Sequence, residues 1–394
     1  MKKILFVMPT LRMGGAEQSL ISLLSYIDYE KYNVDLFLFE QNGELFSKIP
    51  QGVTLLNENE ITKSMLLEFK KYYKILLRKG KFFALILRVI MMINSKIEQM
   101  LNRKLVYNWN ISKHVIESID KKYDVAIGYL EGVTDAFVID KVNADRKIGW
   151  IHNDFSKMGR NFIAEEKYYD KFDCIAIISQ ECRDQFLIKY PHLDTKVEIV
   201  PNGINKQEII KMSVSNKYDK RDISKFQIVT VGRLEHQKGI DIAIYAAQIL
   251  KENNIAFEWH IYGEGHMRNN LQSIIDKLNL REFVYLNGIT QNPYVYMKHA
   301  DVVVQSSRYE GKSIVLDEAK LLARPIVVTN YPSVVDQIKN EYTGIIVGMS
   351  SEELALGILK IINNDVLRDQ LIYNCKVEND ITKNNLDKFY SILE

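Results

Sequence analysis

Two glutamates with seven residues between them, Glu310 and Glu318, lie in the stretch DVVVQSSRYEGKSIVLDEAKLLARPIVVTN, residues 301–330. An apolar run of strand length is followed by a polar loop and by residues 314–322, where apolar positions recur at helical spacing. Pro325 and the run PIVV predict the end of this helix and the next strand. The N-H groups at such a helix start attract anions. The carboxylates would repel a phosphate but accept hydrogen bonds from hydroxyls, so the stretch predicts a nucleotide-sugar site.

A second loop, GRLEHQKG at residues 232–239, carries two bases where an apolar run ends and a helical pattern begins. Arg233 and Lys238 flank this turn, and both can point at the start of the helix. A diphosphate requires such charge-assisted donors when no metal neutralises it. The sequence contains no Asp-x-Asp, so we expect neither a metal nor another cofactor. Two ordinary surface bases beside a turn, and two solvated acids on a surface helix, are the alternatives.

Short apolar runs alternate with helical patterns along the whole chain, which is typical of α/β folds with parallel sheets. Residues 205–225 are polar and poorly patterned, as a linker would be. We therefore predict an N-terminal domain at 1–204 and a C-terminal domain at 205–380. Strands are expected at residues 3–9, 34–39, 53–56, 124–128, 147–151, 174–179, 197–200, 226–231, 259–262, 283–286, 301–305, 325–328 and 344–347, with a helix at 16–27.

Candidate ligand groups also follow strands in the N-terminal half. Gly14 and Gly15 come after the first strand, and His152 comes directly after the strand that ends at residue 151. Open parallel sheets bind ligands beyond the carboxyl ends of their strands. We therefore include Gly15 and His152 in the site, although Gly-Gly occurs in many turns and a lone histidine is more often structural.

Several of these segments resemble the retaining, two-domain glycosyltransferases of family 4. SRYEGKSIVLDEA resembles the family's Glu-x7-Glu signature, GRLEHQKG its diphosphate clamp, GGAE its first loop and WIHND the segment whose histidine contacts the donor sugar. The turn PNG at 201–203 resembles the crossing between domains. This resemblance implies the GT-B fold, two Rossmann-like domains facing each other across a cleft, with the last helix, 381–394, returning to the first domain.

The resemblance also implies residue roles. Arg233, Lys238 and backbone N-H groups at residues 311–313 would stabilise the departing diphosphate, Glu310 would hold sugar hydroxyls, and Glu318 would hold the ribose. Attack would occur on the front face with the leaving phosphate taking the proton, and Glu310 as a nucleophile stays an alternative. The catalytic set is Glu310, His152, Arg233 and Lys238. The donor-binding set is Gly15, Arg233, Lys238, Gly263, Ile289, Gly311, Lys312, Ser313, Ile314 and Glu318.

Residues 63–104 differ from the rest of the chain. They contain eleven lysines and arginines against two glutamates, a net charge of +9 within a chain of net charge +2, and they include the run FFALILRVIMMI. Basic, strongly apolar helices of this kind can lie in a membrane interface, and solvated lysines over packed helices are the alternative. We expect contact with the inner membrane surface through Phe82, Phe83, Leu85 and Leu87. No base-reading motif accompanies the charge, so nucleic acid is not expected.

Composition agrees with a folded protein in a reducing compartment. The chain of 394 residues has three cysteines without metal spacing, and its N-terminal apolar run is too short for a signal peptide. We expect a cytoplasmic enzyme, peripheral on the inner face of the cell membrane. It would transfer a sugar from a nucleotide-diphosphate sugar, expected to be a UDP-sugar, to a lipid-linked or polysaccharide acceptor in capsular or other bacterial surface glycan synthesis. A non-catalytic relative acting as a binding or chaperone subunit, and a phosphorylase or epimerase, remain the alternatives.

Overall fold

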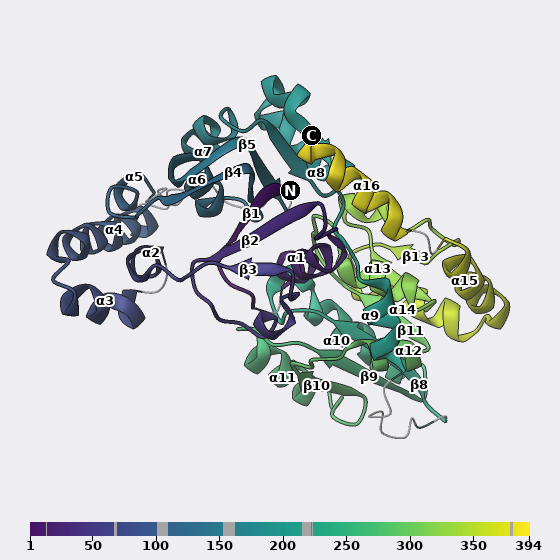
Figure 1. Ribbon diagram of the computed structural model, residues 1–394. Coiled ribbons are helices and arrows are strands. Elements are labelled where there is room, and N and C mark those ends of the chain that lie inside the picture. Colours follow the sequence, from purple (N-terminus) through teal and green to yellow (C-terminus); the bar gives the residue numbers. More distant parts are fainter. Residues whose placement is uncertain are drawn as a thin grey trace. The chain divides into compact units, whose positions relative to one another are not determined.

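The computed structural model describes residues 1–12, 14–66, 69–100, 109–152, 162–214, 222, 224–378 and 381–394. Two compact units make up the chain (Figure 1). Unit 1 comprises Met1–Gly203 and Asn385–Glu394, and unit 2 comprises Ile204–Asn384. Each strand expected from the sequence is present, so the predicted α/β fold with two successive parallel sheets is confirmed.

The described part of unit 1 holds a seven-stranded sheet in the order β3-β2-β1-β4-β5-β6-β7, and all its strand pairs are parallel. Its strands are β1 Lys2–Met8, β2 Tyr32–Leu38, β3 Val53–Leu55, β4 Ile119–Gly128, β5 Val142–Ile151, β6 Cys174–Ile177 and β7 Val197–Ile199. Its helices are α1 Gly15–Tyr26, α2 Glu60–Leu66, α3 Phe69–Arg78, α4 Phe82–Met100, α5 Trp109–Ser112, α6 Val133–Lys141, α7 Phe162–Tyr169 and α8 Gln180–Lys189.

The apolar run of β1 is buried because helices cover both faces of the sheet, which is the usual setting of a parallel strand. Strand order reverses between β1 and β4, where ligands bind in open α/β sheets. β4 and β5 each begin five residues earlier than the sequence predicts. Their first halves are polar and largely exposed, so they pair with each other without the apolar pattern of a buried strand.

The described part of unit 2 holds a six-stranded parallel sheet in the order β10-β9-β8-β11-β12-β13. Its strands are β8 Phe226–Val231, β9 Phe257–Tyr262, β10 Val284–Gly288, β11 Val302–Gln305, β12 Ile326–Thr329 and β13 Ile345–Val347. Its helices are α9 Lys206–Ser213, α10 Ile240–Glu252, α11 Arg268–Lys277, α12 Tyr294–His299, α13 Ile314–Leu321, α14 Ser351–Ile362 and α15 Asp365–Val377. The order reverses between β8 and β11, so the loops that follow these two strands leave the sheet side by side.

The last helix, α16 Ile381–Leu393, packs its end on the unit 1 sheet. Phe389 is fully buried there and stacks on Phe6 with ring centroids 6.2 Å apart. The Arg146 Nε donates to the Ile392 carbonyl at 3.0 Å. The end of the chain is therefore part of the core of unit 1.

Candidate functional site

The loop after β8 is shaped by glycines that no other residue could replace without strain. Gly239 caps α10 with φ +59°, and a Cβ there would lie 2.0 Å from the Ser306 carbonyl oxygen. Gly263, directly after β9, has φ +151°, and a Cβ added there would lie 1.9 Å from the Gly232 carbonyl oxygen. The loops after β8, β9 and β11 therefore meet backbone to backbone, and Lys238 lies in the first of them, two residues before α10.

An arginine clasp holds the β11 loop against the β8 loop. Arg308 forms two hydrogen bonds to the Asp241 carboxylate, at 2.9 and 2.6 Å, and a third to the His236 carbonyl at 2.7 Å. The Ser306 hydroxyl adds a bond to the Lys238 carbonyl at 3.0 Å. A planar guanidinium suits this two-oxygen contact, which fixes direction as well as distance. The clasp aligns the loops that carry Lys238 and Glu310.

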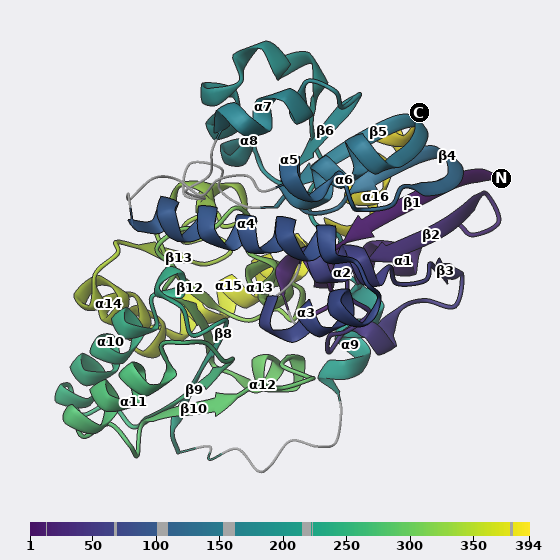
Figure 2. The same cartoon turned by 90° about the vertical axis from the view of Figure 1, so that its left-hand side faces the viewer.

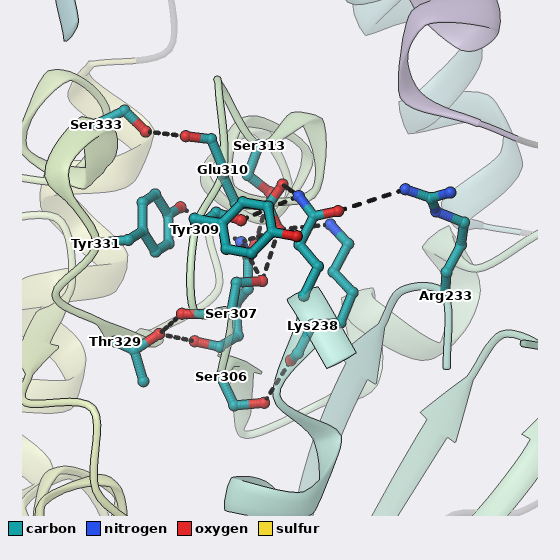
Figure 3. Close-up of polar contacts among 12 residues, drawn as sticks. Arg233, Lys238, Ser306, Ser307, Tyr309, Glu310, Ser313, Thr329, Tyr331 and Ser333 are labelled. Atoms are coloured by element: carbon teal, nitrogen blue, oxygen red, sulfur yellow. Dashed lines mark hydrogen bonds and ion pairs between the residues drawn. The ribbon is translucent and has the colours of Figure 1, made fainter. Parts of the chain in front are cut away.

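Lys238 and Glu310 form an ion pair between these loops, with 2.6 Å between Nζ and Oε1 (Figure 3). The same carboxylate oxygen accepts from the Ser307 hydroxyl at 2.6 Å and from Gln305 Nε2 at 3.4 Å. Gln237 Nε2 lies 3.5 Å from the other oxygen. Glu310 is only 8% exposed, so its charge is neutralised within the protein.

Arg233 lies across from this pair in Figure 3 and is exposed. Its Nη2 is 3.5 Å from Gln237 Oε1, and Gln237 in turn donates to the Tyr309 carbonyl at 3.0 Å. Of the two bases expected to bind a diphosphate, Lys238 is thus held in a buried pair while Arg233 extends into solvent. Both cations and Glu310 come together at the carboxyl edge of the unit 2 sheet.

The start of α13 is fixed by a glutamine. Gln337 accepts from the Ser313 N-H at 2.8 Å and donates back to the Ser313 carbonyl at 2.7 Å. The Ser313 N-H, expected to contact the diphosphate, is therefore occupied by Gln337. Lys312 turns back to Asp317, 3.5 Å from Nζ to Oδ2, and both side chains are largely buried. Gly311 precedes them in the same buried loop, and Ile314 begins the helix.

Glu318 lies deep in α13, where it is 3% exposed, and accepts from the Tyr294 hydroxyl at 3.0 Å. Tyr294 opens α12, shortly after the loop at residues 288–292 that contains Ile289, one of the expected donor-binding residues. The Gly263 N-H, from the loop after β9, donates to the Gly288 carbonyl at 2.9 Å, while Ile289 is exposed. The structure thus brings the 288–292 loop beside the carboxylate expected to contact the ribose.

Charge around Glu310 also acts on a neighbouring tyrosine. The Tyr331 hydroxyl accepts from Gln305 Nε2 at 3.3 Å. Burial raises the pKa of Tyr331 well above 10, and the carboxylates of Glu310 and Asp317 add to the effect. Tyr331 therefore stays neutral at physiological pH and serves as a polar support of the β11 loop.

In unit 1, His152 ends β5 and is 7% exposed. Its backbone N-H donates to Glu131 Oε2 at 2.9 Å, and its ring stacks on Trp150 with ring centroids 5.8 Å apart. Neither ring nitrogen forms a hydrogen bond with any described residue. Burial lowers the pKa of His152 to about 4, although nearby Glu131, Asn202 and Tyr129 favour the charged form. A neutral imidazole with unused hydrogen-bonding capacity suits contact with a hydroxyl.

Gly15 begins α1 and is exposed after the end of β1. Gly15 follows β1, at the reversal of strand order between β1 and β4. His152 follows β5 in the same unit. The residues that follow His152 in the WIHND segment lie outside the described part of the chain.

The basic segment 63–104 forms α2, α3 and α4, and its residues 67–68 and 101–104 lie outside the described part. Figure 2 shows α4 in front, on the outer side of unit 1. Ala84 and Met91 are buried, and Leu85 and Leu87 pack partly against the core. The opposite face is apolar and exposed: Phe82, Phe83, Ile86, Val89, Ile90, Ile93 and Ile97. The expected contact at Phe82 and Phe83 is thus on the surface, whereas Leu85 and Leu87 face inward.

Sequence reasoning missed several residues that shape the site. Asp241 and Gln337 lie far along the chain from the groups they hold, so no local pattern marks them. Gln305 lies only five residues before Glu310, but their contact depends on the turn of the β11 loop. Glu131 could have been found because, like His152, it closely follows a buried strand of the sheet. Among the described residues no group of three or more His, Cys, Asp or Glu could hold a metal ion. No helix in the described ranges is long and apolar enough to cross a membrane.

Known proteins share this architecture at low identity. A glycosyltransferase from Rickettsia africae aligns with a TM-score of 0.70 at 16% identity, covering 100% of this chain and 97% of that one. A variant of TarM from Staphylococcus aureus, solved with UDP, aligns with a TM-score of 0.67 at 18% identity over 100% of both chains. These likenesses show the fold, and the expected GT-B class is confirmed.

Sequence comparisons match a family model and several glycosyltransferases. Residues 215–377 match the family model described as Glycosyl transferases group 1. An uncharacterised glycosyltransferase of Methanocaldococcus jannaschii is 31% identical over 201 residues, 48% of this chain and 49% of the relative. The poly(ribitol-phosphate) alpha-N-acetylglucosaminyltransferase of Staphylococcus aureus is 33% identical over 141 residues, 35% of this chain and 28% of the relative. The chain thus spans half or less of the length of these two relatives.

A third relative aligns over nearly the whole chain. It is the N-acetylgalactosamine-N,N'-diacetylbacillosaminyl-diphospho-undecaprenol 4-alpha-N-acetylgalactosaminyltransferase of Campylobacter jejuni, 25% identical over 371 residues, 93% of this chain and 92% of the relative. Residues 215–377 thus match the group 1 glycosyltransferase model, and the Campylobacter jejuni relative extends the likeness to glycosyltransferases over nearly the whole chain.

Proposed function

We propose that the protein transfers a sugar from a nucleoside-diphosphate sugar to a hydroxyl of a lipid-linked or polysaccharide acceptor in bacterial surface glycan synthesis. The observation that carries this proposal is the convergence of Arg233, Lys238 and Glu310 from two loops at the strand-order reversal of unit 2. The 205–380 domain would hold the donor. The 1–204 domain would hold the acceptor and contribute Gly15 and His152.

The proposed chemistry follows from where charge develops. Breaking the bond between sugar and phosphate places negative charge on the diphosphate and positive charge on the anomeric carbon. Arg233 and Lys238 would stabilise the diphosphate, together with backbone N-H groups at the start of α13 other than that of Ser313, which Gln337 already binds. Removing one such donor typically lowers the rate on the order of 10²-fold to 10³-fold. No metal is needed in this scheme, because the cations supply the charge.

We propose retention at the anomeric carbon through front-face attack, with the leaving phosphate taking the acceptor's proton. The surroundings of Glu310 favour this over attack by the carboxylate. Its Oε1 accepts from Ser307 and Gln305, and each donor lowers the nucleophilicity of the oxygen. Glu310 is better suited to hold sugar hydroxyls, and His152 to orient the sugar as a neutral ring.

Relatives suggest the substrates. The TarM variant was solved with UDP, and HepE of Anabaena was solved with UDP-glucose. The name of the Campylobacter jejuni relative includes a diphospho-undecaprenol acceptor, as does that of an Escherichia coli galactosyltransferase 26% identical over 49% of this chain. We therefore propose a UDP-sugar donor and a lipid-linked acceptor.

A thermal-shift panel tests the donor site. UDP, GDP, ADP and their sugars are added without metal to the parent, to Arg233→Ala with Lys238→Ala, and to Lys225→Ala. Lys225 pairs with Glu258 at the opposite edge of the same sheet and is the control. We expect stabilisation by one nucleotide class, kept in the control and lost in the double variant. If no nucleotide stabilises the parent, the non-catalytic relative becomes the better interpretation.

An activity assay with the nucleotide sugar that stabilises the parent separates the remaining alternatives. Sugar release to free phosphate would indicate a phosphorylase, and release without an acceptor would indicate hydrolytic or epimerase chemistry. Neither is favoured by a specific observation. Arg233, Lys238, Glu310 and Glu318 are all present and placed together in unit 2, whereas a binding subunit would not need them.

We further propose that α4 carries the protein to the inner face of the membrane. Residues 69–97 contain eight lysines and arginines and no acid, so they would be attracted to anionic headgroups. The exposed face of α4 runs from Phe82 to Ile97, about 22 Å at 1.5 Å per residue. A second copy of the chain would bring two such basic segments together, so a lipid surface is the better occupant.

Vesicle sedimentation tests this contact. Changing Ile86, Ile90 and Ile93 to Ser removes exposed apolar groups without touching the buried face. The control changes three exposed apolar residues of α15 to Ser: Val366, Tyr373 and Val377. We expect the parent and the control to sediment with vesicles containing phosphatidylglycerol, and the α4 variant to stay in solution. Equal sedimentation of both variants would contradict the proposal.

A further inference from the structure

The Lys238–Glu310 pair poses a problem for the proposed function, on which this inference rests. The cation expected to hold the diphosphate and the carboxylate expected to hold the sugar are bound to each other, 2.6 Å apart. Their side chains are 16% and 8% exposed. An ion pair so withdrawn from water is only weakly screened, so any ligand must compete with it.

We propose that the Glu310 carboxylate competes with the donor's diphosphate for Lys238, and that donor binding exchanges one partner for the other. In the empty site Lys238 neutralises Glu310. When a diphosphate arrives, the ammonium moves to the phosphate oxygens and Glu310 Oε1 is left with Ser307 and Gln305. Glu310 then accepts hydrogen bonds from sugar hydroxyls only when a diphosphate is present.

The surroundings of Lys238 allow this movement with little rearrangement. Its aliphatic carbons pass over Gly232, where a Cβ would lie 3.5 to 3.7 Å from them. The ammonium can therefore swing while the stem keeps its packing. Glu310, in contrast, is held from several sides: Ser307 and Gln305 bind its carboxylate, and the Ser333 hydroxyl donates to its carbonyl at 2.8 Å.

The exchange has a consequence after transfer. The nucleoside diphosphate product must again compete with the Glu310 carboxylate for Lys238. In the empty site, that carboxylate lies 2.6 Å from the Lys238 ammonium. That competition lowers the affinity for the product and favours its release. Glu310, proposed to bind the sugar hydroxyls, would thus also set how tightly the nucleoside diphosphate is bound.

Isothermal titration with UDP, GDP and ADP on Glu310→Gln tests the exchange. Glutamine keeps the shape of the side chain but removes its charge. We expect roughly tenfold tighter binding of the preferred nucleotide, because the Lys238 ammonium would no longer have to leave a carboxylate 2.6 Å away, and such a pair interacts strongly in a partly buried site. Glu258→Gln removes a carboxylate from the Lys225 pair, 2.9 Å long, in the same unit, and should leave the affinity unchanged.

The Lys238→Met background shows whether the effect passes through the lysine. There the gain from Glu310→Gln should disappear. A gain that persists would mean that the carboxylate repels phosphate directly, which overturns the exchange. Unchanged or weaker binding by a folded Glu310→Gln in the parent background also overturns it. If that variant unfolds, Glu310→Asp keeps the charge but withdraws it from Lys238, and unaltered affinity there counts against the exchange.

The two proposals fail differently. If none of the three nucleotides binds the parent or any variant, the proposed donor site is wrong and the exchange falls with it. If the parent binds one of them and Glu310→Gln binds it equally well, only the exchange is wrong.

Discussion

The burial of His152 predicts a specific pH dependence of stability. The pKa falls from 6.5 in the unfolded chain to about 4 in the folded protein, mainly because burial disfavours the charged ring. As the pH falls through 6.5 the unfolded state takes up a proton that the folded state does not bind. The stabilisation is therefore complete above pH 6.5, is lost between pH 6.5 and about 4, and changes no further below that.

The size of this effect follows from the two pKa values. One pKa unit corresponds to about 1.4 kcal/mol, so the difference between 6.5 and about 4 corresponds to roughly 3 kcal/mol in the free energy of unfolding. Urea unfolding of the parent and of His152→Gln is compared between pH 7.5 and 4. The parent should lose about 3 kcal/mol more than the variant over this range.

NMR titration of the ring protons measures the pKa of His152 directly and does not depend on two-state unfolding, which a chain of two units need not show. His192→Gln, which removes a half-exposed histidine of the same unit, controls for the loss of one imidazole. A His152 ring that titrates near pH 6.5, or equal pH dependence in parent and variant, would refute the burial argument. The imidazole would then be solvated, and its proposed role as a neutral ligand would be lost.

The remaining predictions concern contacts within each unit. Gly239→Ala should cost roughly 2 kcal/mol or more in urea unfolding and abolish nucleotide-induced thermal shifts, because φ is +59° and a Cβ would strike the Ser306 carbonyl. Arg308→Ala should cost roughly 1–2 kcal/mol, while Asp241→Asn should cost less because an amide still accepts one bond; equal losses would contradict the two-oxygen contact. Phe389→Ala should cost roughly 3–5 kcal/mol, measured by urea unfolding followed with unit 1 tryptophan fluorescence, and wild-type stability would show that α16 is not part of that core.

Much of the fold was predictable because parallel strands buried on both faces are read as continuous apolar runs. β1, β8, β11 and β12 are all of this kind. The prediction was least accurate for β4 and β5, whose first halves are polar. There the strand is defined by hydrogen bonds to its neighbour and not by burial, so the side-chain pattern carries no signal.

The site, like the fold, was predictable only in part. The sequence marks Lys238 and Glu310 as candidates because each is a charged residue beside a glycine that follows an apolar run. The sequence does not predict their ion pair, because 71 residues separate them and they meet only through the adjacency of β8 and β11. Gln337 at Ser313 and Tyr294 at Glu318 are contacts of the same long-range kind.

The sequence by itself determined that the chain forms two α/β units, which loops carry charge, and that residues 63–104 are basic and apolar. Only the tertiary structure decided which of those charges meet, which face of α4 is left uncovered, and that α16 packs into unit 1. The physical reason is that strand and helix periodicity depend on near neighbours along the chain. Side-chain partnerships depend on strand order and packing, which bring together residues that no local pattern relates.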